Sequence, residues 1–161
     1  SRTTGSAWRT TRRGRSAALN MVITSTGAVS AVAKAIPELK GILTGNAIRV
    51  PTPNVSLAVM SLMLSEETTK EVINDFLKNN AFHSKFREIL GYVNSPEIVS
   101  TDFYSSPFAS IVDSQATIAK GKQVTLYCWY DNEYGYSKQV VSLAKKVANI
   151  QMPRLPLPKD N

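Results

Sequence analysis

The fold is decided by residues 25–64, which read STGAVSAVAKAIPELKGILTGNAIRVPTPNVSLAVMSLML. Thr26 is a suitable N-cap for the helix that follows, and the residues up to Ile36 are almost all small and apolar. A helix with so little polar surface is expected to be buried on most sides. Two β-type runs come next, over 42–50 and 55–64, and the Pro-Thr-Pro-Asn sequence between them predicts a turn.

Outward from this stretch, the spacing of apolar residues predicts further helices and strands. In chain order these are an amphipathic helix capped by Ser65 with Glu66 and Glu67 in its first turn, a shorter helix that ends at Gly91, a strand and loop over 98–107, a hairpin of 110–119 with 123–130, and a last helix over Tyr136–Asn149. Strands and helices without strict βαβ alternation favour an α+β fold, in which helices cover a mixed, mostly antiparallel sheet.

The length and composition exclude several classes of protein. The chain has 161 residues, one Cys and one His, so neither a disulfide framework nor a zinc site of these side chains is expected. No apolar run reaches the roughly 18–20 residues that a membrane-spanning helix needs, so no membrane partner is expected. A chain of this length is expected to form one folded region, over 16–150, between an Arg-rich loop over 1–15 and a Pro-rich tail over 151–161.

The net charge of +7 is concentrated at the beginning of the chain. The first 15 residues contain five arginines and no acidic residue, which leaves +2 (+7 minus +5) for the rest of the sequence. An Arg-rich, acid-poor start of this kind is typical of targeting segments. Because no alternation of basic and aromatic residues follows it, nucleic-acid binding is not favoured.

Three places carry residue types suited to binding a ligand. Ser25-Thr26-Gly27 places a hydroxyl and exposed N–H groups at a helix start, which suits an anion, although an ordinary N-cap has the same pattern. Arg49 stands alone in an apolar run, where a guanidinium needs a carboxylate or phosphate unless the position faces solvent. The stretch Trp129–Ser137, WYDNEYGYS, is either a ligand-binding edge or a packed corner between a strand and a helix.

Two residues of reactive types are not expected to act in catalysis. Cys128 lies in the middle of a predicted strand, with no His or helix start nearby in sequence, which favours a buried and unreactive thiol. His83 has no visible partner in the sequence pattern, so we expect it to serve packing or the surface.

The motifs just described resemble those of a known family. STGAVSAVAKAIPELKGILTGNAIRVPTPNVS, followed by WYDNEYGYS, is similar to the C-terminal catalytic domain of glyceraldehyde-3-phosphate dehydrogenase, from about Arg12 to Ile150. The resemblance implies an enzyme of glycolysis that also has a dinucleotide-binding domain. It further implies a homotetramer that oxidises glyceraldehyde 3-phosphate with NAD and inorganic phosphate. We expect a cytoplasmic location or, alternatively, an organelle.

The resemblance also implies phosphate-binding roles for individual residues. Thr26 and Gly27 look like the pair that holds the attacking inorganic phosphate, and Arg13 is similar to a second arginine at that phosphate. Arg49 resembles the arginine that grips the C3 phosphate of the substrate.

Two further residues resemble cofactor contacts of the family. Asn132 looks like the asparagine that bonds the nicotinamide carboxamide, and Tyr136 looks like the tyrosine packed beside the nicotinamide. Residues 1–15 correspond to an S-shaped loop that helps to form the cofactor site of a neighbouring subunit.

The sequence departs from the family in its catalytic pair. The family's nucleophilic cysteine lies in a Ser-Cys-Thr-Thr-Asn motif, and neither this motif nor the family's base histidine occurs in the 161 residues. Thioester chemistry needs a thiolate beside a base, so we expect no dehydrogenase activity and no tight NAD binding from this chain alone.

The alternative interpretation is a non-catalytic structural or interaction subunit derived from the same family. An apolar side of the last helix, around Val140, Leu143 and Val147, would be an association surface without a covering domain. Both interpretations predict an oligomer or a partner domain.

Overall fold

The computed structural model describes residues 19–150, and the chain divides into two compact units. Unit 1 is Ser1–Pro53 and unit 2 is Asn54–Asn161. The predicted loop over 1–15, which contains Arg13, and the predicted tail over 151–161 lie outside the described residues.

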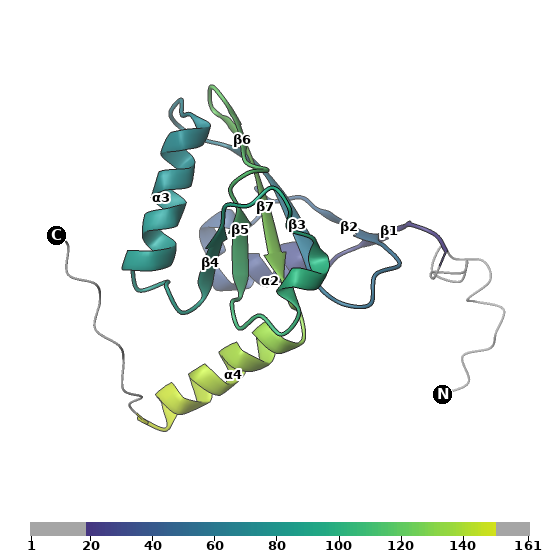
Figure 1. Cartoon of the computed structure of the whole chain (residues 1–161), viewed down its shortest axis with the longest axis vertical. Coiled ribbons are helices and arrows are strands. Elements are labelled where there is room, and N and C mark those ends of the chain that lie inside the picture. Colours follow the sequence, from purple (N-terminus) through teal and green to yellow (C-terminus); the bar gives the residue numbers. More distant parts are fainter. Residues whose placement is uncertain (1–18, 151–161) are drawn as a thin grey trace. The chain divides into compact units, whose positions relative to one another are not determined.

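The described part of unit 1 contains two short strands and two helical segments (Figure 1). They are β1 (Val22–Ser25), α2 (Ala28–Ala35), the 3-10 helix η2 (Pro37–Leu39) and β2 (Asn46–Arg49). β1 and β2 form an antiparallel two-stranded sheet. The run predicted as a strand over 42–50 is therefore shorter, and its partner is β1 and not the run over 55–64.

The expectation that the small, apolar helix is buried on most sides is wrong. No residue of α2 is buried, and Val32 and the following Ile36 are 38% and 48% exposed. The reason is that η2 and the loop at Gly45, described parts of unit 1 that lie beside this helix, leave each of its residues at least partly exposed. An apolar composition shows that a helix surface is suited to burial, but it does not show whether another element packs against that surface.

Unit 2 is built on a five-stranded sheet. Its strands are β3 (Ser56–Met63), β4 (Leu90–Val93), β5 (Ser110–Asp113), β6 (Ile118–Lys120) and β7 (Gln123–Tyr130). The order is β3-β7-β5-β4, and β6 pairs with β7 beyond the end of β5. The β4–β5 pair is parallel and the other pairs are antiparallel, which confirms the predicted mixed, mostly antiparallel α+β sheet.

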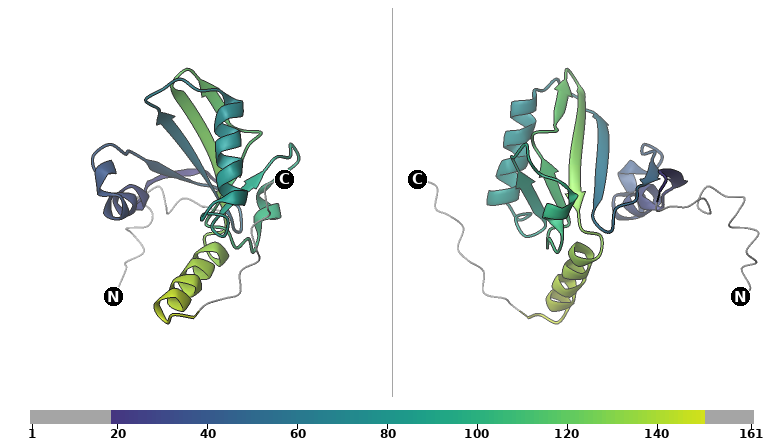
Figure 2. Two further views of the ribbon diagram at one scale, coloured as in Figure 1. Left: turned by 90° about the vertical axis from the view of Figure 1, so that its left-hand side faces the viewer. Right: turned by 45° about the vertical axis from the view of Figure 1, so that its right-hand side comes forward.

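Helix α3 (Lys70–His83) covers one face of this sheet (Figure 2). The buried cluster beneath it comprises Val112 of β5 and three alternate residues of β7, namely Val124, Leu126 and Cys128. Ile73 and Leu77, one turn apart on α3, pack against this cluster. Apolar residues at every second position of β7 and four positions apart on α3 therefore form the main core.

A second cluster lies on the opposite face of the sheet, near the carboxyl end of β7. Val55, Ile111 and Phe103 are buried there, and Phe103 belongs to the 3-10 helix η3 (Ser100–Phe103). The Phe103 ring stacks on Trp129 of β7, with ring centroids 5.3 Å apart. This cluster fixes the end of β7, from which the chain enters α4 (Tyr134–Val147).

The predicted beginning of α3 is wrong. The helix does not start at Ser65 but after Thr69, whose Oγ1 accepts a hydrogen bond from the N–H of Val72 (3.3 Å). Glu66 and Glu67 consequently precede the helix, and Glu71 is the acidic residue of its first turn. Several Ser and Thr residues precede the apolar pattern, and only the folded backbone selects which of them is the N-cap.

The short helix predicted to end at Gly91 is also wrong, because residues 90–93 form the strand β4. A Cβ at Gly91 would lie 3.0 Å from Ile111 and 3.1 Å from Phe108, so this position allows close packing of β4 against its neighbours. The apolar spacing that suggested a helix belongs partly to α3 and partly to a turn after it.

Three other boundaries differ from the sequence prediction. The stretch over 98–107 contains η3 and no strand. The strand predicted over 110–119 is two strands, because a turn separates β5 from β6 and Asp113 Oδ1 accepts the N–H of Ala116 inside it (3.2 Å). The last helix begins and ends two residues earlier than the predicted Tyr136–Asn149. The hairpin turn before β7 is confirmed, with Gly121 at φ +59.

Candidate functional site

The start of α2 has the arrangement predicted for an anion-binding N-terminus. Thr26 Oγ1 accepts a hydrogen bond from the N–H of Ala28 (3.1 Å), and Ser30 Oγ donates to the carbonyl of Gly27 (2.9 Å). The predicted N-cap role of Thr26 is nevertheless wrong: the N-cap of α2 is Gly27, which has no side-chain cap, and the Thr26 hydroxyl accepts its bond just before the helix. Its own proton remains able to donate to an anion, because a hydroxyl is both donor and acceptor.

Gly27 leaves space beside this hydroxyl. A Cβ at Gly27 would meet no described atom within 4 Å, and the backbone φ of −82° is one that any residue adopts. Neither packing nor backbone conformation therefore demands glycine here. The open space, together with the positive end of the helix dipole, suits the approach of a small anion.

Arg49 ends β2 on the surface of unit 1. Of the two alternatives for this position, the structure has the solvent-facing one, because Arg49 is exposed and the flanking Ile48 and Val50 are 65% and 49% exposed. The guanidinium is therefore not forced by burial to find a partner. Within residues 19–150 it forms no ion pair, so its donors are available for a phosphate or carboxylate.

The register of the β1–β2 ladder separates the two anion-binding groups. Arg49 lies opposite Val22, whereas Thr26 follows Ser25, three residues farther along β1. Thr26 is therefore four residues from Val22, and at about 3.3 Å per residue this offset is about 13 Å. The two residues predicted to bind anions thus lie at separate places, Arg49 at the end of β2 and Thr26 just after β1.

In unit 2, the corner between β7 and α4 is organised by Asp131. Its side chain is only 2% exposed. The carboxylate accepts four hydrogen bonds: at Oδ2 from Asn54 Nδ2 (3.1 Å) and the N–H of Ser105 (2.9 Å), and at Oδ1 from the N–H groups of Glu133 and Tyr134 (both 2.9 Å). The backbone hydrogen bond from Tyr134 is the main cause that lowers the pKa of Asp131, and burial opposes it.

Asn132 and Tyr136 lie exposed beside this buried carboxylate. Oδ1 of Asn132 accepts a hydrogen bond from Ser56 Oγ (3.3 Å), and its Nδ2 group makes no hydrogen bond with the described residues. Tyr136 is 70% exposed on the first turn of α4. The corner therefore presents the Asn132 amide and the Tyr136 ring to solvent, and the buried Asp131 carboxylate stabilises it through hydrogen bonds.

The packed-corner interpretation of this stretch is confirmed for part of it. Trp129 Nε1 donates to Asp113 Oδ2 (3.2 Å), and Gly135 approaches another loop so closely that a Cβ would lie 2.7 Å from the carbonyl oxygen of Phe108. The same nine residues thus combine a packed interior with an exposed edge.

Cys128 is buried as predicted, and burial raises the pKa of its thiol. His83 is exposed at the end of α3 and packs edge-on against Phe82, with ring centroids 6.4 Å apart. Neither has the surroundings of a nucleophile or a base. Among residues 19–150 no group of His, Cys, Asp and Glu is arranged for a metal ion, and no helix is long and apolar enough to cross a membrane.

Sequence reasoning assigned no role to the residues that support Asn132. Asp131 was part of the motif, but its partners Asn54 and Ser105 lie 77 and 26 residues away. The only sequence signal was local: an aspartate two and three residues before N–H groups at a helix start is a common capping arrangement.

Comparison with known proteins decides the family. A family model described as the C-terminal domain of glyceraldehyde 3-phosphate dehydrogenase matches residues 2–132. The chain belongs to this glyceraldehyde 3-phosphate dehydrogenase family. The match includes Thr26, Gly27, Arg49 and Asn132, and it stops before Tyr136.

Curated relatives support the same assignment. The chain is 56% identical over 145 residues to a glyceraldehyde-3-phosphate dehydrogenase-like protein of Pseudomonas aeruginosa, with 90% of the chain and 32% of the relative covered. It is 48% identical over 138 residues to a glyceraldehyde-3-phosphate dehydrogenase of Zymomonas mobilis, covering 85% of the chain and 41% of the relative. A chloroplastic relative of Arabidopsis thaliana is 47% identical over 139 residues, covering 86% and 35%. The chain thus spans about a third to two fifths of the length of these relatives.

Proposed function

We propose that this chain is the phosphate-binding and nicotinamide-contacting part of an NAD-dependent phosphorylating glyceraldehyde-3-phosphate dehydrogenase. In this proposal Thr26 and Gly27 hold inorganic phosphate with Arg13, and Arg49 holds the C3 phosphate of glyceraldehyde 3-phosphate. Asn132 and Tyr136 contact the nicotinamide of NAD. The complete enzyme is an oligomer in which other residues supply the nucleophile and the base.

The observation that carries this proposal is the separation of two anion-binding groups on one two-stranded ladder. A reaction that joins inorganic phosphate to a substrate with a phosphate of its own needs two phosphate-binding places. The hydroxyl and open helix start at Thr26-Gly27 suit one of them, and the surface guanidinium of Arg49 suits the other.

The direct test is a titration of the 161-residue chain with glycerol 3-phosphate, an unreactive analogue of the substrate's phosphate end. Arg49→Ala is expected to weaken binding at least tenfold, which corresponds to about 1.4 kcal/mol. Lys40→Ala removes another exposed cation of unit 1 and serves as the matched control, with affinity close to that of the unchanged chain. Equal affinities of the Arg49 variant and the unchanged chain would disprove the assignment of Arg49.

A coupled NADH assay tests the expected lack of turnover by the isolated chain. Because a thioester mechanism needs a thiolate beside a base, and Cys128 is buried with a raised pKa, we expect no oxidation of glyceraldehyde 3-phosphate above background. Turnover near that of a complete dehydrogenase would contradict the proposal.

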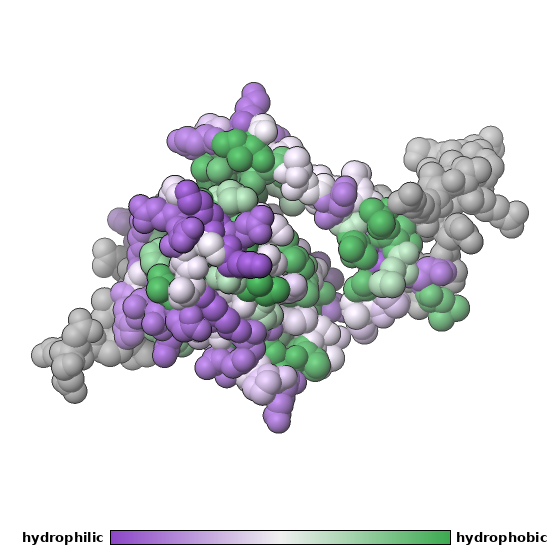
Figure 3. Space-filling model, turned by 90° about the horizontal axis from the view of Figure 1, so that it is seen from above, coloured by the Kyte–Doolittle hydropathy of each residue, from purple (hydrophilic) through white to green (hydrophobic). Residues whose placement is uncertain are grey.

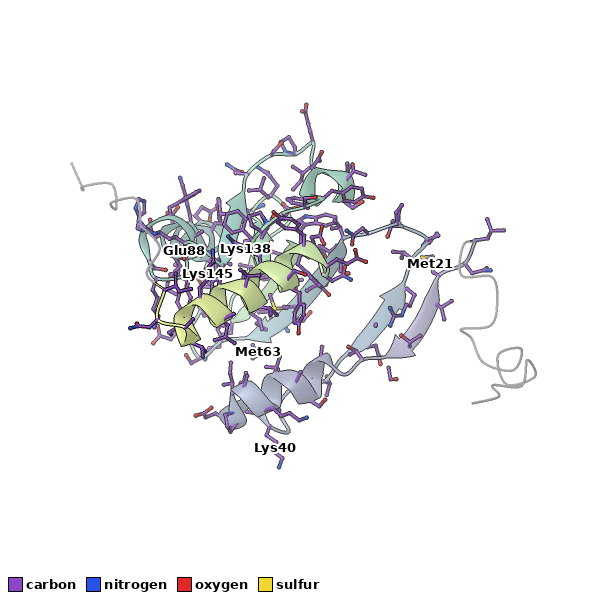
Figure 4. The ribbon with its side chains drawn as sticks, turned by 90° about the horizontal axis from the view of Figure 1, so that it is seen from below. Met21, Lys40, Met63, Glu88, Lys138 and Lys145 are labelled. Carbon is purple, nitrogen blue, oxygen red and sulfur yellow. The ribbon has the colours of Figure 1, made fainter. Side chains whose placement is uncertain are left out.

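The second candidate function is that of a non-catalytic interaction subunit. One observation favours it: Val140, Leu143 and Val147 on α4 are 47%, 62% and 80% exposed. Figure 4 shows this helix with Lys138 and Lys145 labelled, so the exposed apolar residues share the helix with cations. In Figure 3, which views the molecule from the side opposite to that of Figure 4, hydrophobic residues (green) also lie at the surface among hydrophilic ones.

Multi-angle light scattering with variants of α4 tests whether the chain associates through this helix. A structural subunit is expected to associate through α4, and Leu143→Glu is expected to abolish the association. Ser142→Glu adds the same charge at the preceding position and controls for charge alone. A well-behaved monomer at all concentrations would remove the support for an interaction subunit.

A further inference from the structure

An exposed amide at the end of a strand binds a small group well only if its position is fixed. Asn132 is such an amide, and the residue before it is almost completely buried. We propose that Asp131 is a positioning residue, whose carboxylate holds Asn132 in the orientation that meets a nicotinamide carboxamide. This inference rests on the proposed function, in which Asn132 contacts the cofactor.

The carboxylate of Asp131 fixes the backbone that follows Asn132. Asp131 Oδ1 accepts the N–H groups of Glu133 and Tyr134, both at 2.9 Å. Asn132 therefore lies inside a turn that is closed by two hydrogen bonds to its neighbour. Its φ and ψ cannot change greatly without breaking at least one of these bonds.

The other oxygen of the same carboxylate attaches this turn to the rest of unit 2. Asp131 Oδ2 accepts Asn54 Nδ2 (3.1 Å) and the N–H of Ser105 (2.9 Å). Ser105 has φ +59, in the left-handed region that an L-residue adopts only at a cost. One carboxylate thus joins three segments of the chain: the turn at Asn132, the loop at Ser105 and the beginning of β3.

The segment 54–56 connects Asp131 to the side chain of Asn132. Two residues after Asn54, Ser56 Oγ donates to Asn132 Oδ1 (3.3 Å). Val55, between them, is buried at φ +70, and a β-branched residue keeps this conformation only where its surroundings impose it. The segment 54–56 is therefore held by Asp131 at one end and holds the Asn132 amide at the other.

The chemical result is a side chain with one defined free donor. With Oδ1 engaged by Ser56, the Nδ2 group remains free to donate to a carboxamide oxygen, and Oδ1 retains a second lone pair. A carboxamide offers both a carbonyl acceptor and an N–H₂ donor, so an amide fixed in this way is complementary to it. A freely rotating amide would lose this complementarity for much of the time.

The test uses nuclear magnetic resonance on the 161-residue chain, with Asp113→Asn as a matched control. Asp113 is also a buried carboxylate of unit 2, and it accepts Trp129 Nε1 and the N–H of Ala116 (both 3.2 Å) instead of the bonds around Asn132. In the unchanged chain we expect an ordered Asn132 side-chain amide with a distinct shift. Asp131→Asn is expected to make this amide mobile and to leave the Trp129 indole resonance in place, and Asp113→Asn is expected to have the opposite effects.

A milder variant covers the case in which Asp131→Asn does not fold. Asn54→Ala removes one bond to the carboxylate and leaves the backbone bonds of the turn intact. It is expected to increase the mobility of the Asn132 amide, while Asn80→Ala, which removes an amide bonded only to its own helix, is expected to leave it unchanged. An Asn132 amide that stays ordered in Asp131→Asn, or in Asn54→Ala where the first variant is unfolded, would overturn the proposal.

Addition of NAD separates this inference from the proposed function. In the unchanged chain we expect NAD at millimolar concentration to shift the Asn132 amide, and Asp131→Asn or Asn54→Ala to weaken this response about tenfold. If NAD shifts nothing in the unchanged chain, the cofactor contact fails, and the order of Asn132 still tests the positioning. If NAD shifts the Asn132 amide equally in the unchanged chain and in the variant, the positioning role of Asp131 is wrong and the cofactor contact stands.

Discussion

The substitution Asp131→Asn tests how much the hydrogen bonds of the buried Asp131 carboxylate stabilise unit 2. The carboxylate accepts four hydrogen bonds in a site that is 2% exposed. An asparagine keeps one oxygen and places an N–H₂ group at the other position, so two of the four donors then face a donor. Breaking a buried bond to a charged group costs about 1.5–3 kcal/mol.

Two such losses give an expected destabilisation of about 3–6 kcal/mol, a large share of the roughly 5–15 kcal/mol that stabilises a domain. Urea unfolding followed by the fluorescence of Trp129, which stacks on Phe103, is a suitable assay. With a slope of about 1–3 kcal/mol per molar urea, the midpoint should fall by about 2 M. Asp102→Asn, at an exposed carboxylate that accepts only the N–H of Val99 (2.7 Å), is the control and should cost about 1 kcal/mol. A loss below about 1 kcal/mol for Asp131→Asn would refute the reasoning.

The pH dependence of the same variant has a defined sign. Hydrogen bonding lowers the pKa of Asp131 in the folded chain, so the unfolded chain binds its proton first as the pH falls. The stabilisation by this carboxylate is therefore complete above its unfolded pKa of about 3.9 and decreases below it. Unfolding measured between about pH 5 and pH 2 should show a weaker dependence in Asp131→Asn than in the unchanged chain.

The remaining predictions concern single positions. Ser105→Gly keeps the N–H that Asp131 accepts and relieves the left-handed φ, so it should stabilise unit 2 by about 0.5–1 kcal/mol, and a lower melting temperature would contradict this. Gly135→Ala places a Cβ 2.7 Å from the Phe108 carbonyl oxygen and should cost about 1–3 kcal/mol despite the better helix propensity, whereas Gly27→Ala, with nothing within 4 Å, should leave unfolding nearly unchanged. Cys128 should react with a thiol reagent only after urea is added, because burial raises its pKa, and rapid reaction of the folded chain would disprove this.

The sequence was sufficient for elements whose signal is local and strong. The strand over 123–130 was predicted with its observed bounds, since alternate apolar residues form the core and Gly121 permits the turn before it. The fold class followed from the order of strands and helices. The helix beginning near Thr26 was also predicted, although its N-cap is Gly27 and not Thr26, because the residues that mark its start are adjacent in the sequence.

Elements that depend on distant partners were not predicted correctly. Gly91 ends a helical pattern in the sequence, but in the structure it lies inside a strand because β5 pairs with it and Phe108 packs on it. Burial of α2 was inferred from composition, but each of its residues is at least partly exposed. The site shows the same distinction. The exposed residues that resemble ligand contacts were found from motifs, whereas the support of Asn132 by Asp131 depends on Asn54 and Ser105, which only the fold brings together.

Amide shift mapping of the 161-residue chain tests most directly whether the β1–β2 ladder and the start of α2 present two distinct phosphate-binding places. Titration with inorganic phosphate should shift Gly27 and its neighbours in α2, and titration with glycerol 3-phosphate should shift residues around Arg49 opposite Val22. Arg49→Ala should remove the second response and preserve the first. The proposal of two phosphate-binding places would be contradicted if both ligands shifted the same residues, or if neither shifted any residue of the ladder or of the helix start.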